Sequence, residues 1–491
     1  MTKLKQHLPS IIALIVGGVV VLLSMLFLKP PFGWGFALVL GLVVFLTPIV
    51  LRNPAFGLAL VGFFLPFERI PTIEIADVSV KINHLLIIFV LIMSLAASLK
   101  NKTLKIPRDP MQFLIAFFIL SMTFSYSVAV NETRALQVIL FMILMLIVYL
   151  TVTLIVQDRK SLFTVVKGIL WGASVVGVLG VFQFLGDKAG LPNTITLLKE
   201  GYDKSTFGFA RIQGFSQEPL YFANYIFIPF LILVVLTLRG GIEKVLNKTW
   251  GYLLGGILLV DFIIAVSRGA YLAALVVFVV LLIAQAKIIF RAKVIIPVIL
   301  CLALVSGAVY LALVKSERRA LDEFVAHVQV QDRTEGESVV SRLNASREAL
   351  DLFSENFLFG AGAGNFGPRV QGSPNEMPEG GWFIVNNEYL EILAENGIIG
   401  AIVFAAIIFV TFFRLILSYT RIDKGLFKSL ILGLSLALIG ILAQYATFST
   451  IYIFHIWFLF GLCGAVSNII LDQESRLSLG LGSQSGKQVK T

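Results

Sequence analysis

The stretch NNEYLEILAENGIIG (residues 386–400) joins a polar segment to an apolar run and decides how the second half of the chain is organised. Residues 315–397 are the only long polar interruption in an otherwise almost continuously apolar sequence, and they contain SRLNASREALDLFSENFLFGAGAGNFG (341–367). A polar loop of this length between two membrane spans is rarely only a connector. We therefore expect residues 315–396 to form a large loop that covers a functional site, and the chain to re-enter a membrane at residue 397.

The composition around this loop predicts an all-α, polytopic integral membrane protein. The chain has 491 residues, of which 58% are hydrophobic, a value outside the range of soluble globular chains. Its two cysteines, Cys301 and Cys463, lie far apart in apolar runs. Such placement suggests neither a disulfide framework nor a thiolate metal site.

About 20 apolar residues cross the hydrocarbon core of a bilayer, and this rule predicts about 14 transmembrane helices. They lie near residues 11–28, 34–51, 54–67, 82–99, 111–127, 135–156, 163–184, 221–238, 250–266, 270–286, 294–314, 397–417, 426–447 and 452–471. The first follows Lys3 and Lys5 without a small-residue cleavage site, so we expect a retained span and not a signal peptide.

Four regions follow from these spans. Residues 1–314 form a bundle of spans 1–11 with an outer loop at 186–220, and residues 315–396 form the large loop between spans 11 and 12. Residues 397–471 hold spans 12–14, and residues 472–491 form a polar tail that we expect to be disordered.

The net charge of +10 is explained by topology. With both termini cytoplasmic, the inner segments carry 23 of the 39 Lys and Arg residues but only 6 of the 29 acidic residues. This is the positive-inside pattern, so the large loop faces outside the cytoplasmic membrane and the charge does not suggest nucleic acid as a partner.

Three outer arginines are the first candidate functional residues. Arg211 lies in FARIQGFSQEPLYFANY, Arg268 in the tight turn AVSRGAYLAAL, and Arg342 in the polar loop. An arginine at a membrane interface is costly to desolvate unless it is paired or functional, and its planar fork suits phosphate oxygens. The alternative is a snorkelling anchor or a salt bridge to a nearby carboxylate.

Glu218 stands directly before Pro219, at the mouth of the span near 221–238. One interpretation is a helix-cap carboxylate, because proline suits the first helical turn. The other is a general base, placed where burial could raise its pKa. Gln213 and Ser216 are polar neighbours that could bind sugar hydroxyls.

Within the large loop, Val339, Leu343, Leu350 and Phe353 recur at helical spacing and predict an amphipathic helix over 339–354, with Arg342 and Ser346 on its other face. The glycine-rich run 360–366 follows no strand, so we reject a nucleotide-binding interpretation. Its glycines instead allow a tight turn and close approach of backbone to another segment or a ligand.

A further helix begins at Asn386 or Asn387, either of which could be its N-cap residue. The sequence contains no DxD pair, no HExxH and no GxSxG, and its four histidines do not cluster. We therefore predict metal-independent chemistry without a cofactor.

Taken in chain order, several short motifs of this sequence resemble those of the O-antigen ligase / O-antigen polymerase superfamily, and the resemblance covers roughly residues 50–470. The matching motifs are RIQG (211–214), SRGA (267–270), Arg342 with the later glycine run at 360–366, NEYL (387–390) and ENGIIG (395–400). The resemblance implies a metal-independent membrane glycosyltransferase that uses undecaprenyl-pyrophosphate-linked glycans outside the cytoplasmic membrane.

The resemblance also implies roles for individual residues. Arg211 and Arg268 would hold the pyrophosphate and, with Glu218 and Arg342, form the catalytic set. The substrate-binding set would comprise Gln213, Ser216, Ser267, Asn365, Asn386, Asn387 and Glu388. The lipid bilayer, a chain-length regulator and a flippase would be further partners.

One departure from the family pattern concerns Asn386, which stands where the ligases of the family usually carry a catalytic histidine. This favours the polymerase branch, with Glu218 as the substitute base and His327 as a weaker candidate. Three alternatives stay open: a ligase that transfers finished glycan to an acceptor, a flippase or transporter of lipid-linked saccharide, and a non-catalytic scaffold. The near absence of charge within the apolar runs, Asp261 excepted, argues against a transporter.

Overall fold

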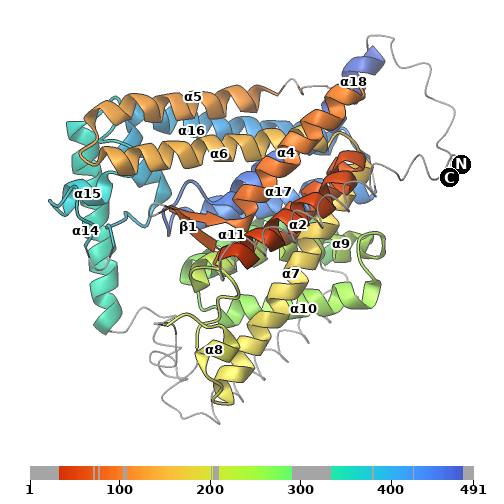
Figure 1. Ribbon diagram of the computed structural model, residues 1–491, viewed down its shortest axis with the longest axis horizontal. Helices are drawn as coiled ribbons and strands as arrows, with labels where there is room; N and C mark the ends of the chain where they lie inside the picture. Colours follow the sequence, from red (N-terminus) through yellow and green to blue (C-terminus); the bar gives the residue numbers. More distant parts are fainter. Residues whose placement is uncertain are drawn as a thin grey trace, which may run out of the picture.

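The computed structural model describes residues 32–69, 72–75, 78–102, 107, 109–200, 202, 210–289, 333–378, 381–423 and 425–478, and these are predominantly α-helical (Figure 1). The α-helices are α2 (Phe32–Arg52), α3 (Pro54–Phe64), α4 (Ile82–Lys100), α5 (Pro110–Ser125), α6 (Glu132–Ile155), α7 (Arg159–Lys188), α8 (Asn193–Thr196), α9 (Pro219–Arg239), α10 (Lys248–Ile264), α11 (Arg268–Ile289), α14 (Arg333–Glu355), α15 (Phe366–Val370), α16 (Glu388–Thr420), α17 (Leu426–Gln444) and α18 (Phe454–Ser478). Two short 3-10 helices lie at Tyr126–Val128 and Ile242–Lys244.

The predicted all-α, polytopic membrane architecture is confirmed. Twelve of the predicted spans coincide with a helix, and those near 11–28 and 294–314 lie outside the described residues. Nine of the described helices are long and apolar enough to cross a membrane. The predicted span at 54–67 corresponds to α3, whose 11 residues rise only about 16 Å, too little to cross a bilayer alone. The count of fourteen spans therefore stays a prediction.

Helix α16 begins at Glu388 after the N-cap residue Asn387, as predicted, and the non-helical Gly397 separates its first turns from the span that is predicted to begin at residue 397. One boundary differs from the sequence expectation. Helix α18 continues to Ser478, beyond the predicted end of the last span at residue 471. The structure also contains an antiparallel hairpin of β1 (Thr72–Ile75) and β2 (Val78–Lys81) that was not predicted, although both strands alternate apolar and polar residues.

Glycines let α3 and α7 approach closely. A Cβ added at Gly168 or Gly172 of α7 would collide with the backbone of Ala59 or Phe63 in α3. Small residues at helix contacts are the common device for close packing in membranes, where burial of apolar surface gives little drive for association. The pair α3 and α7 is thereby fixed at the side of the bundle that supports the loop at 210–218.

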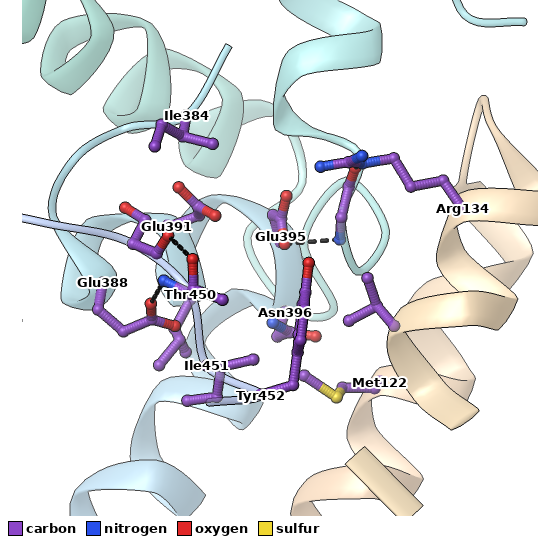
Figure 2. A pocket seen from close by; sticks show the side chains of 14 residues that line it. Met122, Arg134, Ile384, Glu388, Glu391, Glu395, Asn396, Thr450, Ile451 and Tyr452 are labelled. Atoms are coloured by element: carbon purple, nitrogen blue, oxygen red, sulfur yellow. Dashed lines mark hydrogen bonds between the residues drawn. The ribbon is translucent and has the colours of Figure 1, made fainter. Parts of the chain in front are cut away.

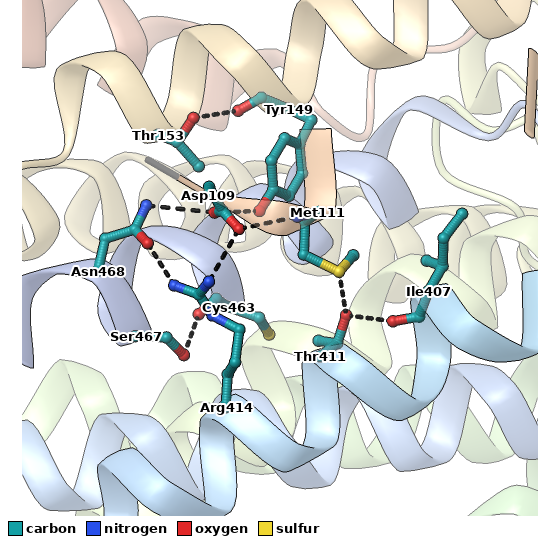
Figure 3. Close-up of polar contacts among 10 residues, drawn as sticks. All are labelled: Asp109, Met111, Tyr149, Thr153, Ile407, Thr411, Arg414, Cys463, Ser467 and Asn468. Atoms are coloured by element: carbon teal, nitrogen blue, oxygen red, sulfur yellow. Dashed lines mark hydrogen bonds and ion pairs between the residues drawn. The ribbon is translucent and has the colours of Figure 1, made fainter. Parts of the chain in front are cut away.

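A buried ion pair joins four helices of the bundle (Figure 3). Nη1 of Arg414 lies 3.1 Å from Oδ1 of Asp109, whose other oxygen accepts hydrogen bonds from Tyr149 and Asn468. Asp109 is 1% exposed. A carboxylate this deeply buried is tolerated because the arginine balances its charge and two side chains donate hydrogen bonds to it. The cluster links α5, α6, α16 and α18.

Helix α16 is broken at Gly397, where φ is +63° and ψ is −167°. The freed backbone groups bond to residues 357–362: Ile398 N donates to Phe357 O, and Ala361 N donates to Ala394 O at 2.8 Å. Non-helical backbone within a membrane protein persists only where other protein groups form hydrogen bonds with its N–H and C=O groups. The run at 360–366 is therefore docked into the break.

That docking confirms the expected role of the glycine-rich run. Gly360, Gly362 and Gly364 all have positive φ, between +69° and +105°, and a Cβ at Gly360 would collide with the backbone of Glu395. The glycines thus provide the tight turn and the close backbone approach that the sequence indicated.

The predicted helix over 339–354 is confirmed as part of α14, but the predicted apolar face is wrong in part. Leu343 and Leu350 are about half exposed, whereas Ala349 and Leu352 are buried. These two pack with Ala361, Phe366, Val385 and Ala394 in a small second core beneath the large loop. The buried face of α14 packs against α16 through Ala349 and Leu352, while Leu343 and Leu350 point away from it.

Candidate active site

The motifs that contain Arg211 and Arg268 meet in the structure. The guanidinium of Arg211 donates to the carbonyl oxygens of Ala265 (3.4 Å) and Val266 (2.8 Å), which end α10, while Arg268 begins α11 two residues later. Val266 has φ +46°, a left-handed conformation that is strained for a β-branched residue. The carbonyl of this strained turn accepts the hydrogen bond from Arg211, so the two predicted arginine motifs lie next to each other.

Helix α7 positions the loop that carries Arg211. Oε1 of Gln183 accepts hydrogen bonds from the backbone N–H groups of Gln213 (3.2 Å) and Gly214 (2.8 Å), and Oδ2 of Asp187 accepts from Ala210 N (3.1 Å). The loop is therefore held at three backbone positions. This rigidity suits a site that must present a charged group in a fixed orientation.

Among the residues that the structure describes, three polar atoms beside Arg211 have no hydrogen-bond partner. Gln213 is fully buried with both its amide atoms unsatisfied, and the hydroxyl of Ser216, which is 1% exposed, is unsatisfied too. Buried polar atoms without partners are rare and mark bound water, ligand or strain. Both residues were predicted to bind substrate, and their orphaned atoms are consistent with a ligand site.

The charge of Arg211 is not balanced by an ion pair in the described part of the chain. Its hydrogen bonds go to neutral carbonyls through Nε and Nη2, which leaves Nη1 without a partner among these residues. Burial lowers the pKa of Arg211 below its ordinary value, while the nearby Tyr202, Tyr271 and Glu218 act in the opposite direction. A guanidinium stays protonated even so, and thus offers positive charge to an anion.

Glu218 occupies the N-cap position of α9, but its side chain makes no capping hydrogen bond. Its carboxylate is close enough to raise the pKa of Tyr202, an effect that adds to burial. Glu218 is therefore the N-cap residue by its place in the chain, but its carboxylate does not cap the helix. The carboxylate itself is half-buried next to the Arg211 loop and is available for chemistry.

The connection between α17 and α18, residues 445–453, links the arginine turn to the start of α16. A Cβ at Gly269 would collide with the side chain of Thr447, so this glycine lies directly against the connection. At its other end, Thr450 N donates to Oε2 of Glu388 (2.6 Å), and Tyr445 O accepts from Glu388 N (2.8 Å). One short segment therefore contacts both predicted halves of the site.

Beyond this segment lies a polar pocket (Figure 2). Its charged and amide side chains are Glu388, Glu391, Glu395 and Asn396 from α16 and Arg134 from α6, and Tyr452 stands at one wall. Sequence reasoning identified only Glu388 here. The spacing of the three glutamates, i, i+3 and i+7, places them on one helix face and was an available signal. Arg134 carried no such signal, because only tertiary packing brings α6 to this face.

The remaining predicted site residues lie around this pocket or outside it. Asn387 is the N-cap of α16 and accepts from Tyr389 N (3.1 Å) and Leu390 N (3.3 Å). Asn386 precedes it with φ +57° and donates to Ile384 O. Asn365 is fully buried and bonds to the backbone of Asn131, so it ties the glycine run to the start of α6.

Ser267 and Arg342 complete the predicted set. Ser267 is 4% exposed and its carbonyl accepts from Tyr271 N, so it sits in the arginine turn. Arg342 is exposed on α14, and its backbone carbonyl accepts a hydrogen bond from the hydroxyl of Ser346 (2.8 Å). His327, the weaker candidate base, lies outside the described residues. Within the described chain, no group of three or more His, Cys, Asp or Glu side chains is placed to hold a metal ion.

Comparison with known proteins gives one family match. Residues 253–405 match the family model described as O-antigen ligase. The matched segment runs from α10 to α16 and contains Arg268, the glycine run and the three glutamates, while Arg211 lies outside it and docks onto it at Val266. No curated protein matches the chain.

Proposed function

We propose that this chain, whose residues 253–405 match the family model described as O-antigen ligase, is a polysaccharide polymerase that elongates a lipid-pyrophosphate-linked glycan. Proteins of this family are glycosyltransferase-like ligases and polymerases. The observation that supports the proposal is the hydrogen bond that joins Arg211 to the turn before Arg268, beside buried polar atoms that lack partners among the described residues.

The two arginines are suited to a pyrophosphate. Arg211 is anchored through Nε and Nη2 and keeps Nη1 for a ligand, and Arg268 starts a helix whose N-terminal N–H groups also favour anions. A guanidinium fork binds phosphate oxygens in a fixed geometry. We propose undecaprenyl pyrophosphate as the lipid carrier of the donor glycan.

The reaction is a displacement at the anomeric carbon of the donor sugar. A hydroxyl of the acceptor forms a new C–O bond to that carbon, and the bond from the carbon to the pyrophosphate oxygen breaks. The lipid pyrophosphate leaves with the electron pair, and the arginines stabilise the charge that develops on it. The proton of the attacking hydroxyl passes to a carboxylate.

Glu218 is the proposed acceptor of that proton. It is half-buried, makes no capping hydrogen bond, and lies in the electrostatic neighbourhood of Arg211. Asn386 at the position of the ligase histidine supports the polymerase over the ligase, since an asparagine amide cannot act as a general base. We place the site on the outer side of the cytoplasmic membrane, as the positive-inside pattern suggests.

The test is an assay of purified protein in nanodiscs with a lipid-pyrophosphate-linked oligosaccharide from its host. We expect a ladder of lengthening lipid-linked products with the wild-type protein. We expect none with Arg268→Ala, and full activity with the matched control Arg347→Ala, an exposed arginine of α14.

Other outcomes would overturn the proposal. Transfer of glycan to an added acceptor without a ladder would identify a ligase. Movement of the lipid-linked sugar across sealed proteoliposomes, with no new glycosidic bond, would identify a transporter. A normal ladder from Arg268→Ala would remove the pyrophosphate role of that residue.

A further inference from the structure

We infer that His455 and Glu68 together hold one buried proton, and that this charged pair positions the loop of Glu218 for the proposed reaction. The histidine lies in the first turn of α18, and the glutamate follows the end of α3. Both side chains are buried. The positioning role rests on the proposed function, whereas the bound proton does not.

A chain of hydrogen bonds determines which nitrogen of His455 carries a hydrogen. Nδ2 of Asn224 in α9 donates to Oε1 of Gln444 in α17 (3.3 Å), so the oxygen of Asn224 is the atom that faces His455. Nε2 of His455 lies 2.6 Å from this oxygen. An amide oxygen only accepts hydrogen bonds, and Nε2 of His455 is therefore the donor.

The other ring nitrogen of His455 faces a carboxylate. Nδ1 lies 3.6 Å from Oε1 of Glu68, and it is buried without a hydrogen-bond partner among the residues that the structure describes. In a neutral ring with its hydrogen on Nε2, the lone pair of Nδ1 would point at a negatively charged oxygen where the dielectric constant is low. One additional proton on the pair turns this repulsive contact into an attractive one.

The charges around the pair favour an ionised Glu68 and therefore a proton on the imidazole. Burial alone would raise the pKa of Glu68, but Lys81 and His455 hold it below its ordinary value. The other titratable side chains that face the pair are those of His84, Tyr221 and Tyr225. An imidazolium beside a carboxylate is thus the arrangement that agrees with both the hydrogen bonds and the charges.

The pair is joined to the loop that carries the proposed base. The carboxylate of Glu68 accepts a hydrogen bond from the backbone N–H of Gln217, the residue before Glu218. The next residue, Arg69, binds the same loop, because its backbone N–H donates to Phe215 O (2.9 Å). A displacement of the Glu68 carboxylate would therefore reach the backbone of Glu218.

The far end of the network is anchored in the connection between α17 and α18. The backbone carbonyl of Gln444 accepts from Thr447 N (2.7 Å) and from Thr447 Oγ1 (2.8 Å). When the proton is lost, Nδ1 of His455 repels Oε1 of Glu68, and the glutamate is the partner that can carry the loop with it. His455 and Glu68 are therefore positioning residues that act through Glu218, and not catalytic residues.

The bound proton is tested by nitrogen-15 NMR of histidine-labelled protein in nanodiscs. The chain has four histidines, and replacement of His7, His84 and His327 by glutamine leaves His455 as the only labelled ring. We expect an imidazolium that persists to higher pH than it does in the same protein with Glu68→Gln. In that variant the amide can donate to Nδ1, so a neutral ring suffices. The same pH dependence of the ring in both proteins would overturn the inference.

The positioning role is tested by the kinetics of polymerisation. We expect His455→Ala to lower kcat by about tenfold to 100-fold, as displacement of a catalytic group does, with an unchanged Kd for undecaprenyl pyrophosphate. The wild-type kcat should fall at alkaline pH as the proton is lost. Glu68→Gln should keep more of kcat than His455→Ala does, and its kcat should not show this fall.

The conservative variant makes the kinetic test independent of how well His455→Ala folds. Glu348→Gln, exposed on α14, is the matched control for Glu68→Gln and should keep the wild-type pH profile. An alkaline fall of kcat in Glu68→Gln equal to that of the wild type would overturn the positioning role.

The two proposals fail separately, because the NMR signal does not depend on the reaction. Arg268→Ala should leave the proton of His455 in place. If Arg268→Ala kept full polymerisation while Glu68→Gln changed the protonation of His455, the proposed function would fail and the bound proton would stand. If Arg268→Ala abolished polymerisation while Glu68→Gln left the His455 signal unchanged at every pH, only the inference would fail.

Discussion

Arg211 and Val266, 55 residues apart in sequence, are joined by a hydrogen bond of 2.8 Å from a guanidinium to a backbone carbonyl. This bond orients the arginine without neutralising it, since a carbonyl carries no net charge. It also fixes a strained turn directly before Arg268. The hydrogen bond therefore holds the loop of Arg211 against the tight connection that precedes Arg268.

Replacement of Arg211 by lysine should reduce polymerisation although the charge is kept. An ammonium cannot contact both carbonyls and a phosphate in the same fixed fork. Loss of one charge-assisted hydrogen bond corresponds to roughly 1.5–3 kcal/mol, or about tenfold to 100-fold in rate. Initial rates of ladder formation for Arg211→Lys and Arg211→Ala check this. Equal rates for wild type and Arg211→Lys would show that only the charge matters.

A substitution at the helix break should prevent folding. Gly397→Ala would force an alanine into positive φ and drive its Cβ into the backbone of Leu358 and Gly360. We expect loss of the monodisperse protein or a large fall in thermal stability in detergent. Gly255→Ala is the control, because a Cβ there meets nothing within 4 Å, and it should be neutral or slightly stabilising. A stable Gly397→Ala protein would contradict the break.

The ion pair between Asp109 and Arg414 should stabilise the fold without taking part in the polymerisation reaction. Asp109→Ala leaves the buried guanidinium of Arg414 without its carboxylate, which typically costs about 3–5 kcal/mol. The melting temperature should fall clearly, while the rate per folded molecule at low temperature stays near that of the wild type. An unchanged melting temperature would contradict the buried pair.

Glu68 should make stability depend on acid pH. Burial alone would raise the pKa of this carboxylate, but Lys81, His455 and the N–H of Gln217 together hold it below its ordinary 4.5. The unfolded chain then binds the proton more readily, so the contribution of Glu68 is present above about pH 4.5 and is lost as pH falls through the lower folded pKa. Unfolding followed between pH 6 and pH 3 should show a steeper loss for wild type than for Glu68→Gln. The same dependence of stability on pH in both proteins would contradict the lowered pKa of Glu68.

The helical architecture could be predicted from the sequence because long apolar runs specify helices by length alone. The paired arginines could be proposed because a charged residue at a tight outer turn is costly and therefore informative. The N-cap at Asn387 and the role of the glycine run also followed from local chemistry.

The pocket could not be predicted in the same way. Arg134 reaches it from α6 only through tertiary packing, and although the spacing of Glu391 and Glu395 puts them on one helix face with Glu388, it does not show that this face is buried. The inward face of α14 was misjudged because the contact with α16 buries Ala349 and Leu352 and leaves Leu343 and Leu350 outside. In each case the deciding interaction joins segments that are distant in the chain.

The central claim is that the arginine turn binds the pyrophosphate of a lipid-linked donor. Its most direct test is the affinity of the purified protein for undecaprenyl pyrophosphate, measured for wild type, Arg211→Ala, Arg268→Ala and the exposed control Arg347→Ala. The account predicts that each of the first two variants weakens binding by at least about tenfold, the equivalent of 1.4 kcal/mol, while Arg347→Ala binds as the wild type does. Equal affinity in all four folded proteins would contradict it.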